Sequence, residues 1–492
     1  MKPNIVFVLI DDMGWTDLGC YGSSFYETPR LDRLAAEGAL FTDAYAAAPV
    51  CSPTRASILT GRYPARVGVT QYIGGHGVGR LADVPYNQFL PTNELSLARA
   101  LRAGGYRTWH VGKWHLGPRR TWPDQHGFDV NIGGCEWGHP KSWFSPYGNP
   151  TLPDGPDGEY LTDRLTDEAI RLIETAGDTP FFLNLWHYAV HVPIHAPAEL
   201  IAKYERKAAE SGLDAVEAFE PGERFPAWHQ RAARVRRRVV QSDPAYAAMV
   251  ENLDTNIGRL LDALEAAGKA DNTIVVFTSD NGGLSTAEGS PTSNLPLSEG
   301  KGWVAEGGVR EPLIVRWPGV VEPGRRIAAP VTSPDFYPTL LAAAGIAGMP
   351  EQHVDGVDVT PLLRGEPFER GPVYWHYPHY SNQGGRPAAA VREGRWKLVH
   401  QFEGDPDTLF DIVADPGEHR DLAAAHPDVA AALRARLLSW IAEVGGLVPP
   451  PNPQPEPFTD LAGYFLGGQV AEPDADVAWD VARPAGKDQP CS

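Results

Sequence analysis

Short apolar segments recur along the chain and predict the strands of a large sheet. Two of them, Ile5–Ile10 and Thr273–Ser279, are rich in β-branched residues. Such runs are typical of strands that are buried on both faces of a parallel sheet. Further strands are predicted over Tyr106–Val111, Phe181–Trp186 and Leu313–Trp317.

Segments with helical signals separate these strands. A Thr-Pro pair and a closing glycine bound a helix over Pro29–Glu37, and Pro244–Ala267 carries a long amphipathic pattern that ends at Gly268. Further helices are predicted over Leu95–Ala103, Leu161–Ala176 and Pro334–Ala344. Strands that alternate with helices in this way indicate the α/β class, with helices packed on both faces of a sheet.

The pattern of apolar and polar residues changes near residue 371. Short alternating runs over Ala388–Val391, Trp396–His400 and Thr408–Asp411 predict a small antiparallel sheet, backed by a helix from Pro427 to Val444. From Pro449 onward the chain is rich in proline and acidic residues. Because 492 residues exceed what one hydrophobic core usually supports, we expect a large domain over residues 1–370, a smaller α+β domain over 371–448 and a tail over 449–492.

One polar stretch, which begins at Cys51, combines helix signals with an unusual reactive residue. Ser52 can cap a helix, Pro53 suits its first position and Gly61 suits its end. Cys51 would then lie at or just before the helix N-terminus, where free N–H groups favour anions, and Arg55 would follow one turn later on the same face. A lone cysteine is usually a small buried apolar residue, so this pattern alone leaves both interpretations open.

Acidic and amide residues follow two of the predicted strands. Asp11 and Asp12 end the first strand, and Asp280 and Asn281 end the strand over Thr273–Ser279. Ligands bind at the carboxyl ends of strands in α/β sheets, so these four side chains are expected to meet there. Together they supply only hard oxygen ligands, which suit Ca²⁺, with Mg²⁺ as the alternative.

Composition and charge narrow the choice of partners. With 43 basic and 62 acidic residues, the formal net charge is −19, which disfavours nucleic acid and anionic membranes. The basic run Arg231–Arg238 is interpreted as a solvated face. The short apolar segment near Met1 lacks the features of a signal peptide or membrane span, so a cytoplasmic location is expected unless a secretion signal has been removed.

Cysteine and histidine spacing gives no zinc or disulfide pattern. The cysteines are scattered at Cys20, Cys51, Cys135 and Cys491. Three histidines lie close together at His187, His191 and His195, but neither a thiol nor an acid accompanies them. Neither set has the spacing of a structural zinc site or a disulfide framework.

Several strings in the chain resemble the signatures of one enzyme family. Cys51-Ser52-Pro53-Thr54-Arg55, with Thr60-Gly61-Arg62 behind it, resembles the Cys-x-Pro-x-Arg signature of the type I sulfatases. The family's further strings are matched in the same order by Gly112–Gly117, by His191 with Pro193, by Ser298–Trp303 and by Glu306–Pro312. The resemblance extends to about residue 420.

The resemblance implies a fold and a chemistry. Type I sulfatases belong to the alkaline phosphatase superfamily, which implies a mixed, mostly parallel sheet and a smaller C-terminal α+β domain with an antiparallel sheet. In this family a formylglycine-generating enzyme converts the signature cysteine, here Cys51, to formylglycine, whose hydrate attacks the sulfur of a sulfate monoester.

The same resemblance assigns roles to individual residues of this chain. The divalent cation would be bound by Asp11, Asp12, Asp280 and Asn281 together with residue 51. Lys113, His191 and Lys301 would bind the sulfate. Arg55 would orient the residue-51 hydrate, Asp280 would lie near the leaving alcohol, and His115 would remove the proton whose loss expels sulfate.

The substrate and two alternative functions stay open. The expected substrate is a small-molecule or carbohydrate sulfate ester, and the aromatic segments Trp137–Tyr147 and Trp375–Tyr380 fit a sugar face and a protein core equally well. The net charge mildly disfavours a heavily sulfated polymer. One alternative is a phosphonate monoester or phosphodiester hydrolase of the same superfamily, and the other is a non-catalytic sulfated-glycan-binding protein with an unmodified Cys51.

Overall fold

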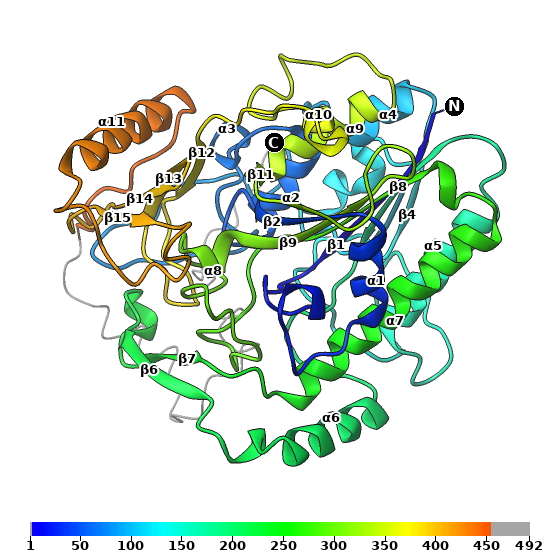
Figure 1. Cartoon of the computed structure of the whole chain (residues 1–492), viewed down its shortest axis with the longest axis horizontal. Coiled ribbons are helices and arrows are strands. Elements are labelled where there is room, and N and C mark those ends of the chain that lie inside the picture. The colour runs from blue at the N-terminus through cyan, green and yellow to red at the C-terminus, as the bar shows by residue number, and fades with distance from the viewer. Residues whose placement is uncertain (1, 454–492) are drawn as a thin grey trace, which may run out of the picture.

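A large mixed sheet forms the centre of the computed structural model, which describes residues 2–453 (Figure 1). Within these residues the sheet has nine strands in the order β10-β2-β9-β8-β1-β5-β3-β4, with β11 beside β2. The strands are β1 (Asn4–Ile10), β2 (Ala39–Tyr45), β3 (Arg107–Gly112), β4 (Val130–Ile132), β5 (Phe181–Trp186), β8 (Thr273–Ser279), β9 (Arg310–Arg316), β10 (Arg325–Ile327) and β11 (Val331–Thr332).

Most strand pairs are parallel, which confirms the expected fold class. Only β9 runs against its neighbours, since it pairs antiparallel with both β2 and β8. The five predicted strands are present, and β9 begins at Arg310, three residues before the predicted start. The sequence analysis missed β2 and the short strands β4, β10 and β11.

Helices cover both faces of the sheet, as predicted. One face packs against α1 (Pro29–Glu37), α5 (Leu161–Glu174), α6 (Ala198–Glu210) and α7 (Pro244–Ala266). The other packs against α2 (Cys51–Thr60), α4 (Leu97–Ala103), α9 (Phe336–Ala343) and α10 (Thr360–Arg364). Strand β1 shows why the segment is apolar throughout, because Val6 and Val8 enter the first core while Phe7 and Leu9 enter the second.

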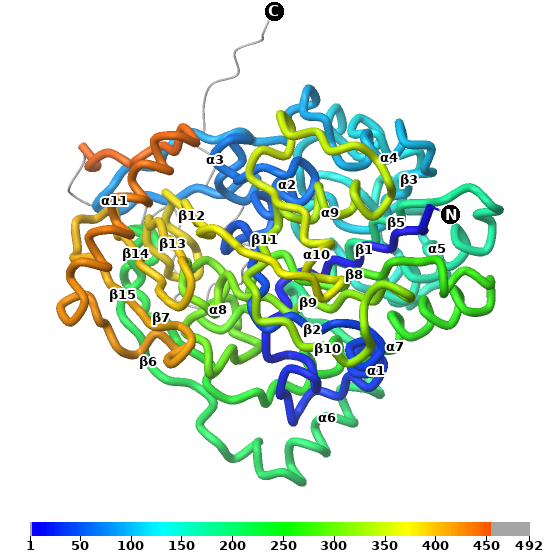
Figure 2. Tube along the Cα trace, turned by 45° about the horizontal axis from the view of Figure 1, so that its top comes forward, coloured from blue at the N-terminus to red at the C-terminus, as the bar shows by residue number. Residues whose placement is uncertain are grey.

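A second, antiparallel sheet lies to one side of the first (Figure 2). Its strands, in spatial order, are β12 (Val373–Tyr377), β13 (Ala388–Glu393), β14 (Trp396–Gln401) and β15 (Thr408–Asp411). Helix α11 (Pro427–Glu443) packs Leu433 and Leu437 against Val391 and Leu398 of this sheet. The predicted small sheet and its helix are therefore confirmed, whereas the exact domain boundaries stay a prediction. Residues 454–492, with Cys491, lie outside the described residues.

Smaller elements complete the fold. The basic run forms part of a two-stranded antiparallel hairpin made of β6 (Phe219–Arg224) and β7 (Arg234–Arg238). Two short helices are α3 (Pro64–Val67) and α8 (Glu306–Val309). Among residues 2–453, no helix combines the length and the apolarity that a membrane span needs.

Candidate active site

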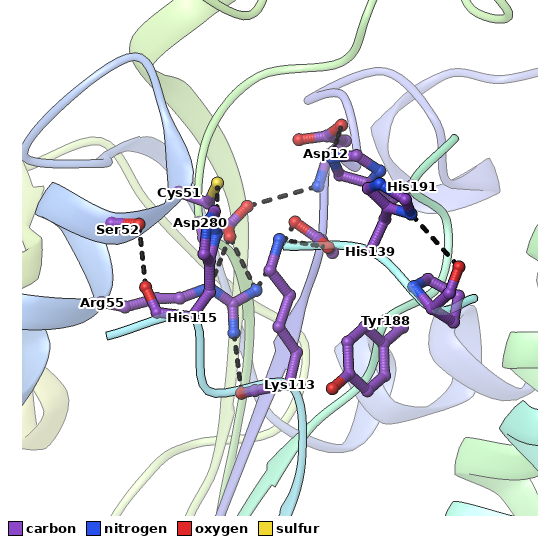
Figure 3. A network of polar contacts seen from close by, with 12 residues as sticks. Asp12, Cys51, Ser52, Arg55, Lys113, His115, His139, Tyr188, His191 and Asp280 are labelled. Carbon is purple, nitrogen blue, oxygen red and sulfur yellow. Dashed lines mark hydrogen bonds and ion pairs between the residues drawn. The ribbon is translucent and has the colours of Figure 1, made fainter. Parts of the chain in front are cut away.

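The predicted site residues converge at the carboxyl ends of four adjacent strands. In the sheet, β8, β1, β5 and β3 are consecutive neighbours. Each is followed directly or within a few residues by site residues: Asp280 and Asn281 after β8, Asp11 and Asp12 after β1, His191 after β5, and Lys113 and His115 after β3. Helix α2 contributes Cys51 and Arg55, and a loop contributes Lys301. Figure 3 shows the side chains of these elements turned toward one another.

Cys51 is the first residue of α2, which confirms its predicted place at the helix N-terminus. The extended Val50 precedes the helix, so the prediction that Ser52 caps it is wrong, as is the first-position assignment of Pro53. Proline is tolerated at the third position because the first-turn N–H groups have no partner within the helix. Gly61 ends the helix with a φ of 67°, as expected.

The hydroxyl of Ser52 does not cap the helix but makes two hydrogen bonds to other segments. Its Oγ donates to the carbonyl oxygen of His115 at 2.9 Å and accepts a hydrogen bond from the backbone N–H of Ile73 at 3.1 Å. Ser52 thus joins three segments of the site: the start of α2, the loop after β3 and the loop that carries Ile73.

The Cys51 side chain faces a histidine and two acids. Its Sγ lies 3.4 Å from Nδ1 of His115, and only 2% of the residue is exposed. Ligand atoms of Cys51, Asp11 and Asp280 all lie within 4.8 Å of one another. Burial raises the pKa of the Cys51 thiol, so the residue is held in its neutral form.

Arg55 bridges the acids behind Cys51. Its guanidinium lies 2.7 Å from Oδ2 of Asp280 and 3.5 Å from Oδ1 of Asp11, and it is completely buried. The guanidinium also lies over the ring of Trp186, 5.1 Å from the centroid. These contacts fix the two carboxylates relative to α2.

Two lysines contact the acids from the opposite side. Nζ of Lys113 donates to Oδ2 of Asp11 at 2.7 Å, and Nζ of Lys301 donates to Oδ2 of Asp12 at 2.8 Å. Lys301 also lies 3.1 Å from Nε2 of His191. All three residues predicted to bind sulfate are therefore brought to one place.

Two oxygen atoms of the predicted cation ligands have no hydrogen-bond partner. They are Oδ1 of Asp11 and Oδ1 of Asn281, and both are buried. Burial raises the pKa of Asp11 well above its usual value. At Asp12 burial acts in the same direction, but the surrounding positive charges, of which Lys301 is the strongest, together outweigh it and lower the pKa. A buried carboxylate cluster with spare oxygen atoms fits a hard divalent cation, which would compensate the desolvation cost.

The two site histidines are neutral. Burial, together with the positive charge of Lys113, holds the pKa of His115 well below its usual value. Burial, together with the charge of Lys301, does the same to the pKa of His191. A neutral imidazole can accept a proton, and Nδ1 of His115 is directed at residue 51.

The sequence analysis missed several neighbours of the site. The ring of His139 stacks on that of His191 at 6.2 Å, and a Cβ on Gly138 would lie only 2.8 Å from the His115 ring. Neither belongs to a matched signature string, although His139 falls within the aromatic segment singled out. The structure brings no zinc site together among His187, His191 and His195 in the described part of the chain.

The two aromatic segments are mainly core. In the first, Trp143 and Tyr147 are buried against the central sheet. In the second, Trp375 and Tyr377 pack beneath the four-stranded sheet and Tyr380 is also buried. Of the two interpretations left open for the second segment, the structure favours the core for these rings.

Comparison with known proteins agrees with this geometry. A family model described as Sulfatase matches residues 3–346. The chain belongs to the sulfatase family. A model for the C-terminal part of N-sulphoglucosamine sulphohydrolase matches residues 300–443 of this sulfatase.

Individual relatives match most of the chain. A sulfatase of Formosa agariphila is 32% identical over an alignment that covers 89% of each protein. The N-acetylgalactosamine-6-sulfatase of Mus musculus is 35% identical, over 76% of this chain and 68% of the relative. The crystal structure of Ps i-CgsB in complex with k-i-k-neocarrahexaose has a TM-score of 0.73 and 28% identity, and covers 97% of this chain and 100% of that one. The protein is thus a sulfuric ester hydrolase.

Proposed function

We propose that this sulfatase hydrolyses a sulfate monoester of a carbohydrate, with formylglycine at position 51 and a bound Ca²⁺, for which Mg²⁺ is the alternative. The observation that carries the proposal is the position of Cys51. Its Sγ and one carboxylate oxygen each of Asp11 and Asp280 all lie within 4.8 Å of one another, and the thiol faces a neutral His115. A thiol in a cluster of hard oxygen ligands is poorly matched to the expected cation, whereas an oxygen at the same position is well matched.

Each group would supply a distinct part of the chemistry. Formylglycine would provide a hydrated aldehyde as the oxygen nucleophile, and the cation, held by Asp11, Asp12, Asp280 and Asn281, would lower the pKa of that nucleophile. Arg55 holds the two nearest carboxylates in place through the contacts described above.

The basic residues would act on the sulfate. Lys113 and Lys301 place ammonium groups opposite α2, where they would neutralise charge on the sulfate oxygens in the transition state. His191 lies next to Lys301, and its Nε2 accepts a hydrogen bond there because its Nδ1 donates to the carbonyl oxygen of Val192. Nδ1 of His115 would accept a proton from the substituent of residue 51.

The carbohydrate part of the proposal rests on relatives. One is a sulfatase of N-acetylgalactosamine, and the structural neighbour was solved with a carbohydrate, k-i-k-neocarrahexaose. Both align with more than two thirds of this chain, so a sugar is the leaving alcohol that they favour.

The test begins with the modification state. The protein is produced together with a formylglycine-generating enzyme, and mass spectrometry of the peptide around residue 51 should show that O has replaced H₂S. The modified protein is then assayed with sulfated galactose, N-acetylgalactosamine, glucosamine and an aryl sulfate, before and after chelation and Ca²⁺ readdition. Sulfate release that requires both the modification and the cation is expected.

Two results would contradict the proposal. Faster hydrolysis of a matched aryl phosphoester would favour the phosphonate monoester or phosphodiester hydrolase. An unmodified thiol in protein from the native host, with sugar binding and no turnover, would favour the glycan-binding protein.

A further inference from the structure

The hairpin β6–β7 is a basic region in an acidic protein. Between residues 217 and 238 the chain has six arginines and three glutamates, whereas the whole chain has a net charge of −19. Figure 1 and Figure 2 both show the hairpin at the lower left, between the four-stranded sheet and α6. None of the residues assigned above to catalysis or to the cation lies on it.

Three of the arginines have no carboxylate partner among the described residues. Arg224 donates to the carbonyl oxygens of Arg231 and Ala232, and Arg234 donates to that of Gly222. Within residues 2–453, Arg231 makes no side-chain ion pair. Because all three residues are exposed, their charges are available to an external anion.

The other end of β7 is fixed in place. Arg237 pairs with Glu223 at 2.8 Å and with Glu299 at 2.6 Å, and the backbone N–H of Arg238 donates to the carbonyl oxygen of Ser285 at 2.8 Å. Glu299 lies two residues before Lys301. The hairpin is thus attached to the segment that brings Lys301 into the active site.

A second connection runs from the hairpin loop to His115. In that loop the side-chain amide of Gln230 donates to the carbonyl oxygen of Asn382 at 3.0 Å. Asn382 in turn donates to the hydroxyl of Tyr72 at 2.8 Å. The next residue, Ile73, contacts both Ser52 and His115. Arg231 follows Gln230 directly, and Arg224 and Arg234 lie at the two ends of the loop, so these contacts connect the arginine-bearing loop to a segment that touches His115.

We propose that Arg224, Arg231 and Arg234 form a binding surface for an extended, multiply sulfated polysaccharide, whose target sulfate lies in the active site while neighbouring sulfates contact the hairpin. The inference rests on the proposed function and specifies its substrate class. A guanidinium presents paired N–H donors that match the oxygens of a sulfate group, as they match phosphate. The local positive charge offsets the repulsion that the acidic protein exerts on such a polymer.

The experiment separates binding at the hairpin from catalysis. The triple variant R224Q/R231Q/R234Q is compared with R107Q/R326Q/R364Q, which removes three exposed arginines elsewhere, each set placed in the C51A background for binding. The probe is carrageenan, with desulfated carrageenan and single-stranded DNA as controls. At low ionic strength the hairpin variant should bind carrageenan about tenfold more weakly, whereas the control variant should bind normally. The difference should shrink as salt is added.

Catalysis is measured with both triple variants in formylglycine-containing protein. Both should hydrolyse a small aryl sulfate with unchanged kcat and KM. Equal carrageenan affinity of the two variants, or wild-type binding of DNA as tight as that of carrageenan, would overturn the inference. Failure of the wild-type protein to hydrolyse any sulfate would instead overturn the proposed function, so the two failures are distinguishable.

Discussion

Two buried ionic clusters in this sulfatase differ in how burial and neighbouring charges act on the pKa of a carboxyl group in each. One lies at the junction of the two sheets and centres on Glu306, which accepts from Nζ of Lys397 at 2.9 Å and pairs with Arg310 at 3.3 Å. Asp43 contacts Arg310 and Arg392 in the same cluster. The other cluster is the active site.

The pKa values of the two carboxyl groups shift in opposite directions. Burial alone would raise the pKa of Glu306, but the charges of Lys397, Arg310 and Arg392 together outweigh it and lower the pKa. At Asp11 burial prevails and the pKa is raised, although Lys113 lies 2.7 Å away. The junction therefore favours the charged form of its central acid, whereas the active site favours the neutral form of Asp11.

The largest expected effect is on catalysis and follows from a change in the active site. Replacing Cys51 by alanine removes the precursor of the nucleophile, so kcat/KM for an aryl sulfate should fall by at least about 10⁴-fold while the thermal unfolding midpoint changes little. Cys20→Ala is the matched control, because Cys20 lies in the turn Gly19–Tyr21, where its backbone N–H donates to Asp32, and it should retain activity. Substantial turnover by C51A would refute the role of this residue.

The second prediction concerns the contribution of Glu306, in the cluster between the two sheets, to stability. Glu306→Gln removes the carboxylate that both Lys397 and Arg310 contact and leaves Lys397 with Glu418, 3.0 Å away, so the free energy of unfolding should fall by about 3 kcal/mol. Asp11→Asn in the metal-free protein should cost less, because burial disfavours the charge of Asp11 more than Lys113 and Arg55 favour it, and the amide oxygen of the new side chain can still accept from Lys113. Urea unfolding in the presence of a chelator measures both. Equal losses for the two variants would contradict the difference between the clusters.

The pH dependence of stability sharpens the comparison, because the two pKa shifts have opposite signs. The lowered pKa of Glu306 means that its contribution is complete above its unfolded value of 4.5 and is lost as the pH falls through the folded value. The raised pKa of Asp11 means that it destabilises the metal-free fold increasingly as the pH rises above 3.8.

Opposite trends should therefore appear in chelator-treated protein. Relative to wild type, D11N should gain stability as the pH rises from about 5 to about 8, while the deficit of E306Q stays constant there and narrows below about pH 4.5. Added Ca²⁺ should raise the unfolding midpoint of the wild type and have little effect on D11N. Parallel pH profiles for the two variants would show that the clusters do not differ in this way.

The same contrast explains which parts of the fold could be predicted. Strands β1 and β8 were found because both of their faces are buried and the sequence is accordingly apolar. Strand β2 was missed because Thr42 and Asp43 interrupt its apolar pattern, and Asp43 is buried only through its two arginine partners. The direction of β9 depends on its neighbours in the sheet, which local periodicity does not encode.

At the site, sequence reasoning found the residue types but not all of their contacts. Acids at strand ends and the signature strings located the predicted site residues that the structure brings together, but not the neighbours His139 and Gly138. Trp375 and Tyr377 were ambiguous because their alternation is the same whether they face a ligand or a core. Ser52 was assigned to a helix cap, since the capping preference is local, whereas its actual partners His115 and Ile73 are distant in sequence.

The two hydrogen bonds of Ser52 lead to the prediction with the smallest expected effect. Ser52→Ala leaves the carbonyl oxygen of His115 and the N–H of Ile73 without their partner, at a cost of about 1 kcal/mol, and should lower kcat about fivefold by loosening His115. Ser57→Ala is the control, because Ser57 is equally buried in α2 but donates to Arg62 at the far end of the helix. It should lose similar stability without losing kcat. If the two variants lost kcat equally, Ser52 would act through the stability of α2 and not through the position of His115.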